Sequence, residues 1–98
     1  MYNNPYREKN IQSGGKTMQI KKRYIGTQET QKGTIQYYMI QKDTYYGVEL
    51  LEGQYPNTIS TMEWFSDDVT DAQTFVELLY RNSASSIHLG ELIDDYII

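Results

Sequence analysis

The spacing of apolar residues changes along the chain, from every second residue to every third or fourth. Before Phe65 apolar and polar residues alternate, as on half-buried strands, and after Asp71 they recur with the 3.6-residue period of amphipathic helices. The chain has 98 residues, enough for one core and too few for two. Strands followed by helices around one small core predict the α+β class.

The first part of the pattern contains four strand-like segments, at residues 18–25, 34–42, 45–52 and 58–65. They are rich in β-branched and aromatic residues. Gly26 and Gly33 flank the first expected connection, and Gly53 with Pro56 marks the third. Short connections favour antiparallel neighbours, so we expect a four-stranded antiparallel sheet in meander order.

Two short helices are predicted after the strands, at residues 71–82 and 89–97. Helices of this length are marginal in water on their own, so both should pack on one face of the sheet. The side chains expected in that contact are Phe75, Val76, Leu79, Leu92 and Ile93. The predicted architecture is therefore ββββαα, with residues 18–98 forming one α+β domain.

Residues 1–17 show neither period and are rich in Asn, Ser and Gly, which predicts a flexible N-terminal arm. The segment Ser13-Gly14-Gly15-Lys16-Thr17 is similar to the end of a phosphate-binding loop. However, the first glycine of that motif is replaced by Asn10, and a strand rather than a helix is expected to follow. No nucleotide or other cofactor is predicted.

Three motifs in the second half of the chain resemble a known family, namely Tyr46-Gly47-Val48-Glu49, Ser85-Ser86-Ile87-His88-Leu89 and Ile93-Asp94-Asp95-Tyr96. The family is a small domain-of-unknown-function family from Gram-positive anaerobes, whose members end in a Thr-Pro-Val-His-Leu-like turn and a closing helix with Glu-Asp-Tyr. This chain differs at Ser86, where the family often has Pro, and at Gly90 in the closing helix. The resemblance spans residues 18–98 and supports the fold, but it implies no activity because none is established for the family.

His88 is the only histidine, and the chain has no cysteine. Glu91 lies one helical turn after His88, a spacing that would suit a general base and its carboxylate. The same spacing suits a helix start with the first residue as N-cap, and we favour that structural role. No pairing of nucleophile and base is evident, so the sequence predicts no catalytic residues and no enzyme activity.

The charges are divided unevenly along the chain. Residues 1–42 carry eight basic and two acidic residues, whereas residues 43–98 carry eleven acidic residues and only Arg81 as a base. The basic run Lys21-Lys22-Arg23 could contact nucleic acid, but it also suits a sheet edge protected from aggregation. Because the pI is about 4.8, direct binding to nucleic acid is not expected.

Two acidic groups flank the predicted helices. Asp67, Asp68 and Asp71 precede the first helix, where the helix dipole favours them, and the spacing of a calcium loop is absent. We therefore predict no metal site. Asp94 and Asp95 lie near a helix C-terminus, where the dipole opposes them, so contact with a partner is the better explanation.

Ten tyrosines are an unusual number for so short a chain. The adjacent pairs Tyr37/Tyr38 and Tyr45/Tyr46 must point to opposite faces of the sheet, so one member of each faces away from the helices. Tyrosine is enriched in interfaces but also simply suits β-sheets, and both explanations remain open. Tyr37 and Tyr45 are taken as the candidates for partner contact.

Together these features predict a non-enzymatic, acidic protein-binding module. The best specific hypothesis is an inhibitor of the phage anti-CRISPR or anti-restriction type, which occupies a basic nucleic-acid-binding surface of another protein. The alternative is a bacterial regulatory or housekeeping domain, possibly homodimeric. No apolar run is long enough for a membrane span, and we expect the cytoplasm of a bacterial host. The predicted partner-binding residues are Glu63, Asp67, Asp68, Asp71, Glu91, Asp94, Asp95, Tyr37 and Tyr45.

Overall fold

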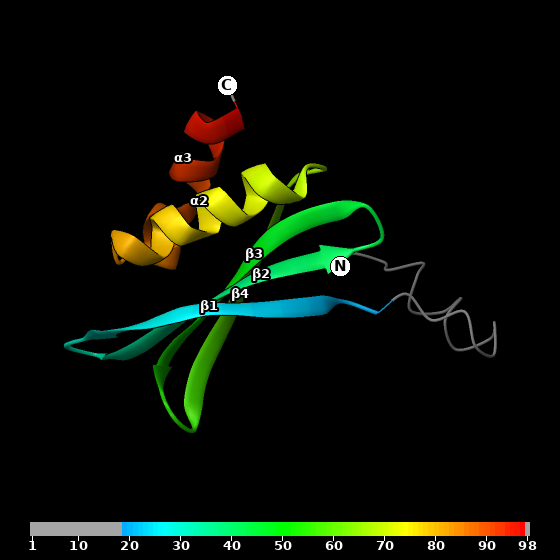
Figure 1. Cartoon of the computed structure of the whole chain (residues 1–98). Coiled ribbons are helices and arrows are strands. Elements are labelled where there is room, and N and C mark those ends of the chain that lie inside the picture. Colours follow the sequence, from blue (N-terminus) through cyan, green and yellow to red (C-terminus); the bar gives the residue numbers. More distant parts are fainter. Residues whose placement is uncertain (1–18, 98) are drawn as a thin grey trace, which may run out of the picture.

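The computed structural model describes residues 19–97 as a four-stranded sheet followed by two helices (Figure 1). The strands are β1 (Lys21–Thr30), β2 (Gly33–Lys42), β3 (Tyr45–Gln54) and β4 (Asn57–Ser66), and the helices are α2 (Val69–Arg81) and α3 (Ser86–Ile97). The predicted ββββαα arrangement is confirmed. The arm predicted at residues 1–17 lies outside the described residues, as does the side chain of Ile97.

The sheet is an antiparallel meander in the order β1-β2-β3-β4, with two-residue turns between successive strands. β1 is displaced from its expected position and extends to Thr30. Gly26 therefore lies inside β1 at an irregularity of the register, and the prediction that it flanks a turn is wrong. The reason is packing against a helix, because a Cβ atom on Gly26 would lie 2.5 Å from Cε1 of Tyr80.

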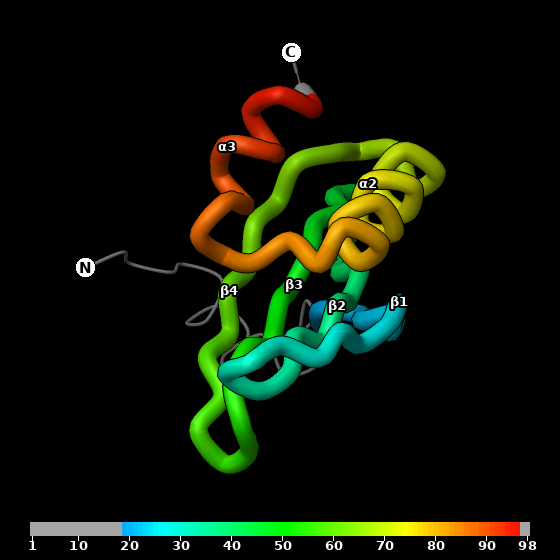
Figure 2. The backbone as a smooth tube through the Cα atoms, turned by 90° about the vertical axis from the view of Figure 1, so that its left-hand side faces the viewer, coloured from blue at the N-terminus to red at the C-terminus, as the bar shows by residue number. Residues whose placement is uncertain are grey.

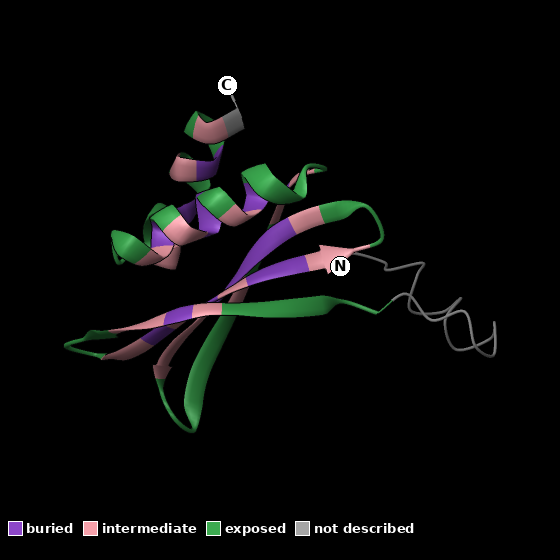
Figure 3. Ribbon diagram, viewed as in Figure 1, coloured by how far each residue is buried: buried purple, intermediate pink, exposed green. Residues whose placement is uncertain are grey.

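Both helices lie on the same side of the sheet, and α2 crosses above its middle strands (Figures 1 and 2). The buried residues of α2 fall on the stripe that faces the strands (Figure 3). Of the expected contact residues, Phe75, Val76, Leu79 and Ile93 are buried and Leu92 is partly buried against the same core. The predicted layer assignment is therefore correct.

Helix α3 begins at Ser86, three residues before the expected start. His88 thus lies within the helix, where its backbone N–H donates to the carbonyl of Ser85 at 3.1 Å, and its assignment as N-cap is wrong. The first N–H of α3 donates instead to Oε2 of Glu52, at 3.2 Å. A carboxylate on β3 meets the positive end of the helix dipole, a long-range contact that no local sequence pattern encodes.

Candidate functional site

The N-terminus of α2 is built at the end of β4. Asp68 is the N-cap, with its side chain accepting from the backbone N–H of Asp71 at 2.9 Å. The Oγ of Ser66 in turn accepts from the backbone N–H of Asp68 at 3.0 Å. The sequence expectation that acids begin this helix is confirmed, and both aspartates have a local structural role.

Tyr96 joins the last turn of α3 to the N-terminal half of α2 and to the end of β4. Its ring packs 4.6 Å from that of Phe75 and 5.5 Å from that of Phe65, measured between centroids. Burial raises the pKa of the Tyr96 phenol, and the negative charges of Asp71 and Asp68 raise it further. Residues that are far apart in sequence therefore meet at one end of the molecule.

We call the exposed carboxylates at the start of α2 and along α3 the acidic end. All of its members are exposed, namely Asp67, Asp68, Asp71, Glu91, Asp94 and Asp95. The two ion pairs found within residues 19–97 are Lys22–Glu49 and Arg81–Glu77, and neither involves the acidic end. The last turn of α3 also contains no basic residue to offset Asp94 and Asp95. None of these six carboxylates is therefore neutralised by an ion pair within the described chain.

Glu63, the remaining acid predicted to bind a partner, lies on a strand and is not part of the acidic end. It lies on β4 opposite Val48, so its side chain is on the helix-covered side of the sheet, and it is exposed because β4 is the outer strand. We therefore treat Glu63 separately from the acidic end.

The two tyrosine candidates have opposite outcomes. Tyr37 is fully buried, and its hydroxyl donates to the carbonyl of Ala84 at 2.7 Å. The sequence prediction that Tyr37 contacts a partner therefore does not agree with its position in the core. Burial and the charge of Glu52 raise the Tyr37 pKa to about 12. Tyr38 takes the face away from the helices, whereas in the second pair Tyr45 is the exposed member, at 51%. Alternation along a strand predicts that two adjacent tyrosines point to opposite faces of the sheet, but it does not predict which of them packs in the core.

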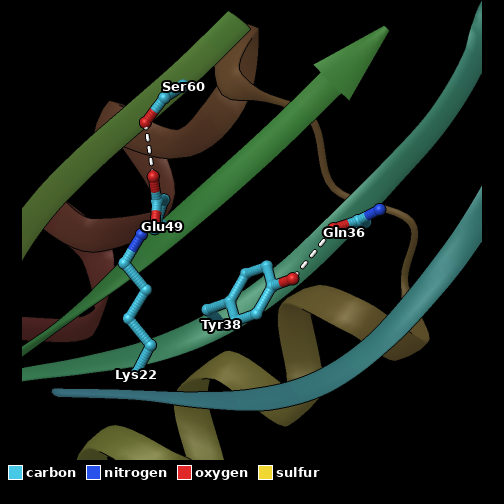
Figure 4. A network of polar contacts seen from close by, with 5 residues as sticks. All are labelled: Lys22, Gln36, Tyr38, Glu49 and Ser60. Atoms are coloured by element: carbon cyan, nitrogen blue, oxygen red, sulfur yellow. Dashed lines mark hydrogen bonds and ion pairs between the residues drawn. The ribbon is translucent and has the colours of Figure 1, made fainter. Parts of the chain in front are cut away.

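A further polar group on the face away from the helices was not singled out from the sequence. Glu49 is only 2% exposed, with Oε1 2.8 Å from Nζ of Lys22 and Oε2 accepting from Oγ of Ser60 at 2.6 Å (Figure 4). The three side chains come from β1, β3 and β4. Strict alternation around Val48 and Leu50 places Glu49 on this face, but its burial depends on neighbouring strands.

No group of three or more His, Cys, Asp or Glu side chains between residues 19 and 97 is arranged to hold a metal ion. Among the helices described, none combines the length and the apolar character needed to cross a membrane.

Comparison with known protein families gives a match over most of the chain. Residues 16–98 match the model of a family of unknown function, DUF6514. Neither the curated proteins nor the solved structures yield a match. The match covers both the sheet and the two helices, so the chain belongs to the DUF6514 family of unknown function.

Proposed function

We propose that this chain is a binding protein without catalytic activity, and that its acidic end docks on a basic surface of another protein. The observation that carries the proposal is the set of exposed carboxylates on α2 and α3, of which Asp68 and Asp71 act on Tyr96 and none forms an ion pair among the described residues. An uncompensated field of this kind speeds association with a basic partner and weakens as salt is added.

The members of the acidic end differ in how far folding explains them. Asp68 and Asp71 stabilise the start of α2, so their presence does not require a partner. Asp94 and Asp95 lie in the last turn of α3, where the partial negative charge at the C-terminus of the helix repels them. Binding is the explanation that accounts for these two residues, and they are the ones to test first.

The narrower form of the proposal is an inhibitor whose carboxylates take the place of nucleic-acid phosphates. Exposed acids on two helices could engage the Lys and Arg side chains that normally hold a phosphate backbone. Inhibitors of CRISPR nucleases or restriction enzymes encoded by phages would work in this way, inside a bacterial cell. A bacterial setting also agrees with the resemblance to a family from Gram-positive anaerobes.

The test is inhibition of DNA cleavage by a panel of purified CRISPR and restriction nucleases. We expect the chain to inhibit at least one of them, with inhibition relieved by added salt and by excess uncleavable duplex DNA. The variant Asp95→Lys should weaken inhibition severalfold or more, whereas Glu29→Lys changes the net charge equally on exposed β1 and should not. Inhibition that is insensitive to salt, DNA and Asp95→Lys would refute phosphate mimicry, and its absence across the panel would refute the inhibitor proposal for these nuclease classes.

A further inference from the structure

The two outer strands of the sheet differ in how their edges are protected. β1 carries the run Lys21-Lys22-Arg23 and has an irregular register at Gly26, and α2 holds it through a hydrogen bond from Nε2 of Gln28 to the Tyr80 carbonyl at 2.8 Å. Charge, irregularity and coverage all discourage an added strand. The edge of β1 is therefore protected against further pairing.

β4 has fewer of these protections over residues 57–63, where Glu63 is the single charged residue. This segment contains no Lys, Arg or Pro, its register with β3 is continuous, and all but Thr61 are exposed. Alternate residues of an outer strand turn their backbone N–H and C=O groups away from the sheet. Within residues 19–97, no strand or loop hydrogen-bonds to that outer side of β4. An edge for main-chain recognition is thus available.

Two exposed side chains of different chemistry, one apolar and one acidic, lie beside this edge. Ile59 and Glu63 lie opposite Glu52 and Val48, so both are on the helix-covered side of the sheet, four residues apart. Ile59 is 70% exposed, which is unusual for an isoleucine in a strand. Glu63 is exposed and has no ion pair with any residue of the described chain.

A groove of about 500 Å³ runs beside Ile59. Ile35 contributes a buried apolar surface to it, and Ile87, on the first turn of α3, contributes an isoleucine that is 84% exposed. An apolar side chain placed opposite Ile59 would enter this groove and cover both exposed isoleucines, which would remove apolar surface from water.

We propose that β4 accepts an extended segment of another protein as a fifth, antiparallel strand. The segment carries a basic side chain and, four residues later, an apolar one. Antiparallel pairing places the apolar residue opposite Ile59, and the basic residue then lies opposite Glu63. Main-chain hydrogen bonds supply the general affinity, and the two side chains supply the choice of segment. This surface is distinct from the acidic end.

A second copy of the chain fits the same edge poorly. Pairing β4 with β4 would bring together two chain halves that each carry eleven acids and one Arg. Pairing β4 with β1 of another copy would leave a free β4 at one end and so generate an open chain of molecules rather than a closed dimer. The charge around β4 thus favours a basic segment from a different protein.

The test uses the full chain and the labelled peptide acetyl-Thr-Lys-Thr-Val-Thr-Leu-Thr-amide, with binding followed by fluorescence anisotropy. Its matched control exchanges the Lys and the Leu. We expect the first peptide to bind at least tenfold more tightly, and the variant Glu63→Lys to remove that preference. The variant Asp95→Lys should leave peptide binding unchanged, so that failure of the acidic-end proposal and failure of this one can be told apart.

Two further peptides, N-methylated at alternate residues, test whether the main chain is involved. Only the version that keeps the amides facing β4 should bind. Equal binding of both versions, equal binding of the Lys/Leu-exchanged control, or no binding at all would overturn the proposal. So would sedimentation that shows a dimer closed through β4, because the edge would then belong to a second copy.

Discussion

The carboxylate of Glu52 caps helix α3 from the neighbouring layer, accepting a hydrogen bond from the backbone N–H of Ser86 at 3.2 Å. Strand β3 and helix α3 are therefore joined by a charged contact at the first residue of α3. The contact also fixes where α3 begins, three residues before the position that its apolar stripe suggests.

Replacing Glu52 by Ala should lower the free energy of unfolding by about 1 kcal/mol, because the first N–H of α3 loses a charged acceptor. Urea unfolding followed by circular dichroism measures this change. The matched variant Glu91→Ala removes an exposed carboxylate from α3 and should change stability by less than about 0.5 kcal/mol. Equal effects of the two variants would show that the cap contributes nothing.

The variant Gly26→Ala should destabilise the fold by about 1–3 kcal/mol, since its methyl group would overlap the Tyr80 ring. In a double-mutant cycle, Tyr80→Ala should relieve most of that cost, giving a measurable coupling free energy. Gly90→Ala is the matched control, because nothing lies within 4 Å of its added Cβ atom and it should be neutral or stabilising. Additive effects at Gly26 and Tyr80 would contradict this packing.

Leu79 and Leu78 are neighbours on α2 with opposite environments, 3% and 46% exposed. Leu79→Ala should cost about 2–5 kcal/mol in unfolding free energy because it leaves a cavity between α2 and the sheet. Leu78→Ala should cost much less, since that side chain is already half in water. Chemical denaturation of both variants tests which stripe of α2 faces the strands.

The Tyr37 phenol should titrate late, with a pKa of about 12. Its pKa in the unfolded chain is about 10, so folding favours the neutral form. Its contribution to stability is complete below pH 10 and is lost as the pH rises from 10 towards 12. Tyrosinate absorbance and urea unfolding between pH 8 and about 12 should show this loss. Tyr37→Phe should flatten the pH dependence, and the exposed Tyr45→Phe should leave it intact.

The double variant Asp94→Lys/Asp95→Lys should leave the melting temperature unchanged or slightly raised, because cations suit the C-terminus of α3. The same variant should weaken binding to a basic partner severalfold or more. Differential scanning calorimetry and binding at two salt concentrations provide the two measurements. A marked loss of stability with unchanged affinity would mean that these aspartates serve folding rather than recognition.

Periodicity predicts most of this fold because it records which side of each element is dry. It predicts the strand and helix order, and it separates Tyr37 from Tyr38, but two adjacent tyrosines have the same polarity and either could face the core. Glycine is typical of turns, so the sequence predicts Gly26 at one. In the structure a glycine is needed there because the ring of Tyr80, on a helix distant in sequence, leaves no room for a Cβ atom. Errors of this kind arise wherever the role of a residue is set by contact with a residue that is distant in sequence.

The candidate site was predictable in composition but not in arrangement. The acids of α2 and α3 could be listed from the sequence, yet the approach of Asp68 and Asp71 to Tyr96 of α3 depends on how the two helices pack. Glu63 has the same chemistry as the other acids, and only the position of β4 as the outer strand separates it from them. The groove beside Ile59 likewise requires α3 to start where Glu52 holds it.

The carboxylate of Glu49 also determines how β3 aligns with its neighbours. Slipping β3 by one residue would exchange its two faces, carrying Glu49 into the apolar layer under α2 and Leu50 out of it. The ion pair with Lys22 and the hydrogen bond from Ser60 would both be broken, leaving a buried charge without partners. Because its two contacts reach different strands, Glu49 favours the observed alignment of β3 between its neighbours over a slipped one.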